Sequence, residues 1–396
     1  MSRYDFDTVI DRKNTSSLKY DFGPERKNRD DLLPLWVADM DFKLPDEIIE
    51  DIEKRVKHGI FGYTDPKEDY YAAVRNWFLK RHGITVKDEW NTITPGVVYA
   101  IATAIRALTE EGDAVLIQQP VYYPFTEMIK LNNRRAVNNQ LIYRDGYYEI
   151  DFNDFENKII SEKVKLFLLC SPHNPVGRVW TKEELIKIAD ICERNGVYVF
   201  ADEIHADFVY KGFKHISYLT LGEKYTKKLI VGTSPSKTFN IAGLQIANIL
   251  IPDENTRKAF RVANEAAGYS QCSALGLTAT ISAYTKGGGW LDELLDYLEG
   301  NVFFIKNYLE EKIPEVRLIQ PEGTYLLWLD FSRIADHHKD LEKIIVDKAH
   351  LWLDPGIIFG RETNLFERIN IAAPRKILEK AMDQLYDAIS NNDSER

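Results

Sequence analysis

Residues 165–203 read KLFLLCSPHNPVGRVWTKEELIKIADICERNGVYVFADE, and this stretch decides the fold. The apolar runs at 165–170 and 197–201 are too short to be helices and are typical of buried strands. Between them, Thr181 is followed three residues later by Glu184, a capping-box signature, and apolar residues at helical spacing continue to Gly196. The stretch therefore predicts a strand, a helix and a second strand parallel to the first.

The same pattern extends to both sides of this unit. Short apolar runs at Ala114–Gln118, Leu229–Gly232 and Asn248–Ile251 predict further buried strands, and they alternate with helical patterns. Such alternation favours an α/β fold with a mostly parallel sheet and helices on both faces. From about Gly289 the pattern changes to long amphipathic helices, at 290–312, 341–349 and 376–390, with strands at 323–331 and 368–371. We expect a large domain over 46–288 and a smaller α+β domain over 289–396.

Composition excludes several classes of protein. The chain has 396 residues, with 51 Lys plus Arg against 61 Asp plus Glu, and a net charge of −10 disfavours binding to nucleic acid or anionic lipid. No window approaches the roughly 18 apolar residues of a membrane helix. The N-terminus has no apolar secretory region, so we expect a cytoplasmic protein. The three cysteines are widely spaced without a C-x-x-C pair, which predicts reduced, buried thiols.

Polar side chains follow three neighbouring predicted strands. Asn174 comes after the run at 165–170, Asp202 after the run at 197–201, and Lys237 after the run at 229–232. Ligands of open α/β sheets bind beyond the carboxyl ends of the strands, so an amide, a carboxylate and an amine should meet at one edge. Each residue alone is ordinary turn, cap or surface chemistry. Asp202 and His205 could form half of a metal site, but no third ligand stands at a matching spacing, and we expect no metal.

An amine, a carboxylate and hydroxyls at one edge are what pyridoxal phosphate requires, for a Schiff base, a protonated pyridine nitrogen and phosphate binding. The motif S-x-S-K at 234–237, with Asp202 and Asn174 before it, resembles the fold-type I pyridoxal phosphate enzymes of the class I and II aminotransferase superfamily. The resemblance runs from about Leu33 to Ile389. It implies a fold-type I transferase fold, whose large domain holds a mostly parallel seven-stranded sheet.

The resemblance also implies roles for individual residues. Lys237 is the catalytic Schiff-base lysine, Asp202 the partner of the pyridine nitrogen, and Asn174 a donor to the ring hydroxyl oxygen and a substrate contact. Arg368 and Ala38 bind substrate, and the arginine suits a carboxylate because it presents a planar fork of two donors. The remaining cofactor residues are Tyr122, which stacks on the ring and is also catalytic, His205 near the ring hydroxyl, and the phosphate set Gly96, Val97, Val98, Ser234 and Ser236.

A homodimer with shared active sites is implied as well. Tyr63, in the sequence FGYT at 61–64, resembles a tyrosine that reaches across a twofold interface to the phosphate of the partner subunit. The N-terminal segment 1–45 is then expected to join the small domain and the dimer interface. The other partner is a small amino-acid substrate, and neither a membrane nor direct nucleic-acid binding is expected.

Four features resemble the branch of carbon–sulfur β-lyases that contains cystathionine β-lyases and cystalysin. They are WVADMDF at 36–42, DEIH at 202–205, His205 in place of a tyrosine, and Gln245 where transaminases place a phosphate-binding arginine. The branch cleaves cysteine-type amino acids such as L-cystathionine or L-cysteine to a thiol, pyruvate and ammonia. Two alternatives stay open: a class I aminotransferase, revealed by turnover with a keto acid, and a pyridoxal phosphate-binding regulatory protein that acts by protein contact.

Overall fold

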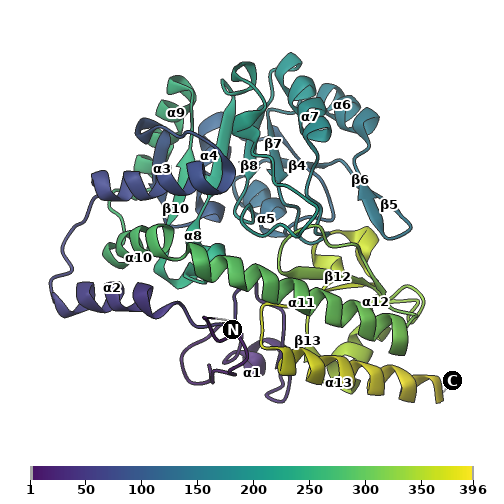
Figure 1. The fold of residues 1–396 in the computed structure, drawn as a ribbon. Helices are drawn as coiled ribbons and strands as arrows, with labels where there is room; N and C mark the ends of the chain where they lie inside the picture. The colour runs from purple at the N-terminus through teal and green to yellow at the C-terminus, as the bar shows by residue number, and fades with distance from the viewer. Residues whose placement is uncertain (1–2, 395–396) are drawn as a thin grey trace.

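The computed structural model describes residues 3–394, and a seven-stranded sheet forms its centre (Figure 1). The strands, in spatial order, are β2 (Asn91–Thr94), β10 (Ala247–Leu250), β9 (Leu229–Thr233), β8 (Tyr198–Asp202), β7 (Leu166–Cys170), β3 (Ala114–Ile117) and β4 (Arg135–Asn138). β8, β7, β3 and β4 run parallel to β9, whereas β10 pairs antiparallel with both β2 and β9. This confirms the predicted α/β class and the mostly parallel seven-stranded sheet.

The stretch that decides the fold behaves as its sequence predicts. All five residues of β7 are buried, and β7 pairs in parallel with β8. The connecting helix α7 (Lys182–Arg194) begins at the capping box, in which Thr181 accepts from the Glu184 amide and the Glu184 carboxylate accepts from the Thr181 amide. Gly196, with φ of 69°, then reverses the chain into β8.

Helices cover both faces of the sheet because successive strand residues point to opposite sides. Leu166 and Leu168 belong to one core, whereas Phe167 and Leu169 belong to the other. The helices whose apolar residues belong to the first core are α4 (Val97–Leu108), α5 (Pro124–Leu131) and α9 (Glu254–Ala266). Those contributing to the second core include α3 (Glu68–His82), α6 (Phe152–Ser161), α7 and α10 (Ala274–Lys286).

The C-terminal part is a smaller α+β layer beside this sheet. The long helix α11 (Gly288–Lys312) crosses below the large sheet and packs on α13 (Arg375–Ser394), as Figure 1 shows. A four-stranded sheet accompanies them, with the order β11 (Arg317–Leu318), β12 (Leu326–Asp330), β15 (Phe366–Asn370) and β14 (Asp354–Pro355). The exact domain boundaries at residues 45 and 288 stay a prediction.

The N-terminal segment lies against this C-terminal part. β1 (Leu33–Pro34) pairs in parallel with β13 (Leu351–Trp352), and Trp36 stacks on Trp352 with ring centroids 4.5 Å apart. The remaining short elements are α1 (Gly23–Lys27), α2 (Asp46–Lys57), β5 (Ile142–Arg144), β6 (Tyr147–Glu149) and α8 (Pro235–Thr238). Within residues 3–394, no helix is long and apolar enough to span a bilayer.

Two sequence predictions are wrong in detail. The helix expected at 341–349 is instead α12 (His338–Glu342) continued by a π-helical stretch, η5 (Lys343–Lys348). Its apolar residues Leu341, Ile344 and Ile345 are buried with this winding, so their spacing did not distinguish it from an α-helix. Cys170 and Cys192 are buried as expected, but Cys272 is partly exposed because it precedes α10 beside a surface depression.

The contribution of the α7 capping box to stability can be tested by substitution. Replacement of Thr181 by Ala removes the oxygen that accepts from the Glu184 amide, and we expect the protein to lose about 1 kcal/mol of unfolding free energy. Urea unfolding followed by circular dichroism measures the loss. Thr181→Ser keeps the accepting oxygen and serves as the control. An alanine variant as stable as wild type would show that the cap contributes nothing, and an equal loss in the serine variant would show that the loss does not come from the oxygen.

Candidate active site

A cavity of about 770 Å³, counted with the solvent at its mouth, lies beyond the carboxyl ends of β7, β8 and β9. Ten of the thirteen residues that the sequence singled out line it, namely Ala38, Gly96, Val97, Val98, Tyr122, Asn174, Asp202, His205, Ser236 and Lys237. Sequence analysis missed five further lining residues, which are Pro95, Cys170, Ile204, Ala242 and Ile246. The chain thus brings together residues that are far apart in sequence, such as Ala38 and Lys237, which are 199 positions apart.

Lys237 lies in α8, directly after β9. Its Nζ donates to the carbonyl oxygen of Ala38 at 2.6 Å, and the hydroxyl of Tyr325 donates to the same oxygen at 2.9 Å. Burial lowers the pKa of Lys237 to about 8, against the smaller opposing effect of the Asp39 charge. The amine is therefore held in place and has a much larger neutral fraction at neutral pH than an ordinary lysine. Tyr325 was not foreseen, because a tyrosine at the start of a buried strand carries no distinctive signal.

Asp202 is the last residue of β8, and its side chain is buried. Burial raises its pKa to about 7, although the Ile204 amide donates to its carboxylate at 3.1 Å and the Lys237 charge favours ionisation. His205 is also buried, and burial lowers its pKa to about 3, so its imidazole is neutral at physiological pH. Its Nδ1 has no hydrogen-bond partner among the residues that the structure describes. A carboxylate and a neutral ring nitrogen are thus presented from one strand end.

The first turn of α4 borders another side of the cavity. Gly96 is its N-cap and provides no side-chain cap, so the amides of the first turn lack the usual side-chain acceptor. A Cβ added to Gly96 would meet nothing within 4 Å, so the space beside this turn is open. Free amides and the positive end of the helix dipole suit a phosphate.

The two serines of the S-x-S-K motif lie differently. Ser236 lines the cavity, but Ser234 does not. The Ser234 hydroxyl donates to the Ile246 carbonyl at 2.6 Å and accepts from the Ser236 amide at 3.0 Å, as the N-cap of α8. Gln245 is exposed, has φ of 50° and lies outside the cavity lining.

Arg368, on β15, is buried next to the cavity. Its Nη1 donates to Asn174 Oδ1 at 2.9 Å, and its Nη2 donates to the Trp36 carbonyl at 3.0 Å and pairs with Asp354. Its Nε is buried and has no hydrogen-bond partner in the described part of the chain. The Tyr122 amide, in turn, donates to the Asn174 carbonyl at 3.1 Å. No sequence pattern pointed to Asp354, which reaches Arg368 through the pairing of β14 with β15.

Tyr63 is far from being buried. Its side chain is 95% exposed, and it borders a surface depression with Phe61 and Cys272. Within the described chain it takes no part in the cavity around Lys237.

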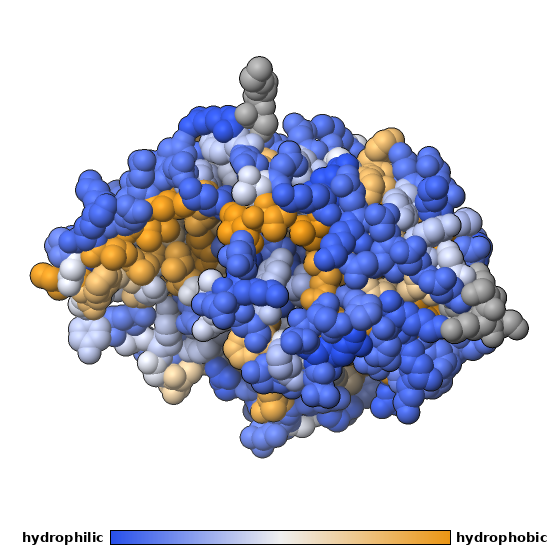
Figure 2. Space-filling model, turned by 90° about the horizontal axis from the view of Figure 1, so that it is seen from below, coloured by the Kyte–Doolittle hydropathy of each residue, from blue (hydrophilic) through white to orange (hydrophobic). Residues whose placement is uncertain are grey.

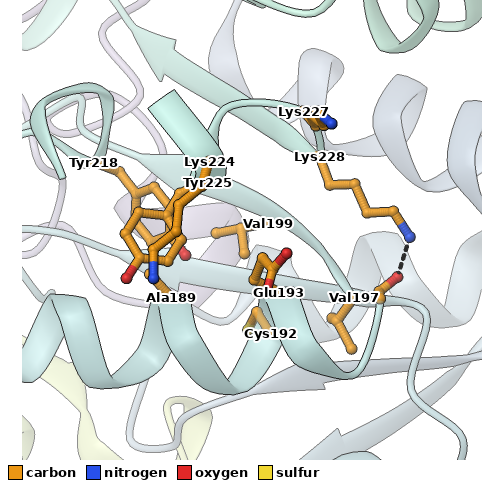
Figure 3. Close-up of a pocket in the computed structure, with 11 residues that line it drawn as sticks. Ala189, Cys192, Glu193, Val197, Val199, Tyr218, Lys224, Tyr225, Lys227 and Lys228 are labelled. Atoms are coloured by element: carbon orange, nitrogen blue, oxygen red, sulfur yellow. Dashed lines mark hydrogen bonds between the residues drawn. The ribbon is translucent and has the colours of Figure 1, made fainter. Parts of the chain in front are cut away.

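A second cavity lies at the opposite ends of β8 and β9 (Figure 3). Three of its polar side chains already have partners: Lys228 Nζ donates to the Gly196 carbonyl at 2.6 Å, and Lys224 Nζ and the Tyr225 hydroxyl both donate to Asp190. The cavity also lies at the amino ends of these strands, whereas ligands of open α/β sheets bind beyond the carboxyl ends. The cavity around Lys237 is the candidate active site.

The residues of this cavity fit pyridoxal phosphate. An amine and a carboxylate stand together, an aromatic side chain is available in Tyr122, and uncapped helix amides face open space. Two buried nitrogens, His205 Nδ1 and Arg368 Nε, have hydrogen-bonding capacity that the protein does not use. Within residues 3–394, no group of three His, Cys, Asp or Glu side chains could hold a metal ion.

The fold and this site define a pyridoxal phosphate protein of fold type I, and sequence comparison agrees. The profile of the family described as aminotransferase class I and II matches residues 30–385, and the chain belongs to this family. Cystathionine beta-lyase PatB of Bacillus subtilis (strain 168) is 40% identical over 385 residues, which cover 97% of this chain and all of that protein. Protein MalY of Escherichia coli (strain K12) is 36% identical over 389 residues, covering 98% and 99% of the two chains.

Structure comparison gives the same result. The crystal structure of cystalysin from Treponema denticola, which contains a pyridoxal 5'-phosphate cofactor, superposes with a TM-score of 0.95. It is 39% identical in sequence and covers 98% of this chain and 99% of its own. These relatives confirm the resemblance that the motif at 234–237 predicted.

The lowered pKa of Lys237 predicts how the cofactor attaches. Only a neutral amine could bond to the cofactor aldehyde, so attachment of added pyridoxal phosphate to Lys237 should speed up as the pH rises through about 8, rather than above 10 as for an ordinary lysine. Borohydride trapping at a series of pH values, followed by mass spectrometry of the Lys237 peptide, measures the rate. Lys237→Ala is the control and should give no trapped product. A midpoint near 10 would contradict the desolvated environment of the amine.

Proposed function

We propose that the protein is a pyridoxal phosphate-dependent carbon–sulfur β-lyase, which cleaves L-cystathionine or L-cysteine-type substrates to a thiol, pyruvate and ammonia. The observation that carries the proposal is a complete cofactor cavity in a chain related along its full length to a cystathionine β-lyase. The cavity supports the cofactor, and the 40% identity supports the lyase reaction over transamination.

The chain's own residues have distinct tasks in this proposal. When bound, pyridoxal phosphate supplies an electron-accepting ring that stabilises negative charge at the substrate's α-carbon. Lys237 takes the α-proton at Nζ, for which its lowered pKa suits it. Asp202 would pair with the pyridine nitrogen, Tyr122 would stack on the ring, and Ser236 with the amides of Val97 and Val98 would hold the phosphate.

Arg368 anchors the substrate carboxylate. Its guanidinium is already oriented by Asn174, Asp354 and the Trp36 carbonyl, so little side-chain freedom is lost when substrate binds. Elimination requires that the sulfur leaves from the β-carbon while Lys237 holds the proton. The pocket for the rest of the thiol is set by loops, and the proposal leaves the size of that group open.

A homodimer with shared sites is part of the proposal. Tyr63 is almost fully exposed, and Ile60 and Phe61 beside it are exposed as well. Figure 2, which views the molecule from below, shows apolar surface across the side where α2 lies in Figure 1. Contiguous apolar surface is typical of protein interfaces. A partner subunit that covers it would bring its own Tyr63 to the phosphate of this site.

We also propose that the protein works in the cytoplasm. Cys170, Cys192 and Cys272 are all free thiols in the structure, in keeping with a reducing compartment.

The reaction is tested with L-cystathionine and holoenzyme in the absence of any keto acid. We expect stoichiometric pyruvate and free thiol, and Lys237→Ala should lower turnover by at least ~10² to 10⁴, the contribution of positioned acid–base catalysis. Pyruvate is followed with lactate dehydrogenase and thiol with a disulfide reagent. Product that forms only after a keto acid is added would show an aminotransferase instead.

The shared site is tested with mixed dimers. Lys237→Ala and Tyr63→Phe should each impair a homodimer, but a heterodimer of the two should regain activity because one of its two sites carries neither change. Differently tagged chains allow the heterodimer to be purified and assayed for pyruvate release. A verified heterodimer without activity would place Tyr63 in the site of its own subunit.

A further inference from the structure

The segment at 36–41, which the sequence marked by its WVADMD pattern, contacts both reactive side chains through its backbone. The Ala38 carbonyl accepts from Lys237, and the Trp36 carbonyl accepts from Arg368. Two residues of one short segment thus contact the amine that takes the proton and the guanidinium that binds the carboxylate. The segment has no regular secondary structure. Its backbone is tied down at the Asp41 amide, which donates to the Ala372 carbonyl at 2.9 Å, and side chains hold the rest.

Two asparagines hold the side of the segment that faces the sheets. Asn370, two residues after Arg368, donates to the carbonyls of Val37 and Asp39, both at 2.6 Å. Asn240, three residues after Lys237, accepts from the Met40 amide at 2.9 Å and donates to the Met40 carbonyl at 2.8 Å. Displacement of the segment would therefore disturb the end of β15, which carries Asn370, and the turn after Lys237, which carries Asn240.

A partly buried ion cluster holds the segment from the N-terminal side: Lys19 and Asp41 are buried, whereas Arg12 and Asp39 are about one-fifth exposed. Arg12 binds both carboxylate oxygens of Asp39, at 3.1 and 2.6 Å, and reaches Asp41 at 2.7 Å. Lys19 has no exposed side-chain surface, and its Nζ donates to Asp41 at 2.8 Å and lies 3.8 Å from Asp39. The cluster of Arg12, Lys19, Asp39 and Asp41 is therefore neutral overall, with each carboxylate contacted by both cations.

Stability alone does not account for such a cluster. Removing charges from water is costly, and a buried cluster is often no more stable than well-packed apolar residues of similar volume. What the charges provide is a fixed geometry, because each of the four has two partners of opposite sign. Asp39 follows Ala38 directly in the chain and belongs to the cluster. Fixing the Asp39 side chain therefore also restricts the position of the neighbouring Ala38 carbonyl.

We propose that the Arg12, Lys19, Asp39 and Asp41 cluster positions the active site for amino-acid binding by fixing the Ala38 and Trp36 carbonyls against Lys237 and Arg368. Arg12 and Lys19 are positioning residues, since neither lines the cavity. The inference rests on the proposed amino-acid site, but it does not depend on the elimination step.

The test uses holoenzyme and L-alanine, which presents the α-carboxylate but has no β leaving group. Its binding is followed by the change in cofactor absorbance. Lys19→Met leaves Asp41 with a weakened counter-charge, and we expect the Kd for alanine to rise about tenfold, which equals 1.4 kcal/mol. With L-cystathionine, KM should rise by a larger factor than kcat falls. Hydrogen exchange of the peptide containing 36–41 should become faster.

Two variants separate positioning from general destabilisation. Lys19→Met combined with Asp41→Asn removes one charge of each sign, and it should return the alanine Kd toward the wild-type value. Lys43 lies just beyond the segment and pairs with Asp46, and both side chains are exposed. Lys43→Met should therefore leave the Kd unchanged. Thermal unfolding of every variant shows whether it is folded at the assay temperature.

The proposal is overturned if folded Lys19→Met binds alanine as wild type does, or if Lys43→Met weakens binding equally. Should Lys19→Met fail to fold, Arg12→Lys takes its place, because it keeps the charge but loses the two-donor fork to Asp39. An unchanged alanine Kd in Arg12→Lys would then overturn the proposal. Wild-type protein that binds alanine but releases no pyruvate would contradict only the lyase reaction.

Discussion

The carbonyl oxygen of Ala38 is the point on which the site depends. It accepts a hydrogen bond from Lys237, which follows β9 of the large sheet. It accepts another from Tyr325, which directly precedes β12 of the smaller sheet. The oxygen itself belongs to the N-terminal segment. Three parts of the chain therefore meet at one acceptor, and a shift of any of them would move the amine that the chemistry requires.

The electrostatics around this point follow from burial. Desolvation lowers the pKa of Lys237 to about 8 and raises that of Asp202 to about 7, so both groups move toward their neutral forms near physiological pH. Their opposite charges pull in the other direction. A site poised in this way exchanges a proton at little cost, which is what an acid–base catalyst needs.

The sequence predicted the sheet and most of the cavity because both depend on local patterns. Buried runs such as 166–170 and the capping box at Thr181 determine the strands and helix without help from distant residues. The residues it missed, Tyr325 and Asp354, reach the site through tertiary packing and strand register. Ser234 is the opposite case, a residue that the sequence singled out but that does not line the cavity. Its motif suggests phosphate contact, but its hydroxyl caps α8 and donates to the Ile246 carbonyl.

The distribution of charge explains how a phosphate could be held without an arginine at position 245. Among the described residues that line the cavity, Lys237 carries the only cationic side chain, and the proposed reaction uses it as the base. Arg368 is adjacent, but Asp354 neutralises it and its guanidinium donates to Asn174. A phosphate would then depend on neutral donors, which are the uncapped amides of α4 and the Ser236 hydroxyl. Because neutral donors are weaker than charge-assisted ones, a further contact from Tyr63 of a partner subunit would matter more here than in a site with an arginine.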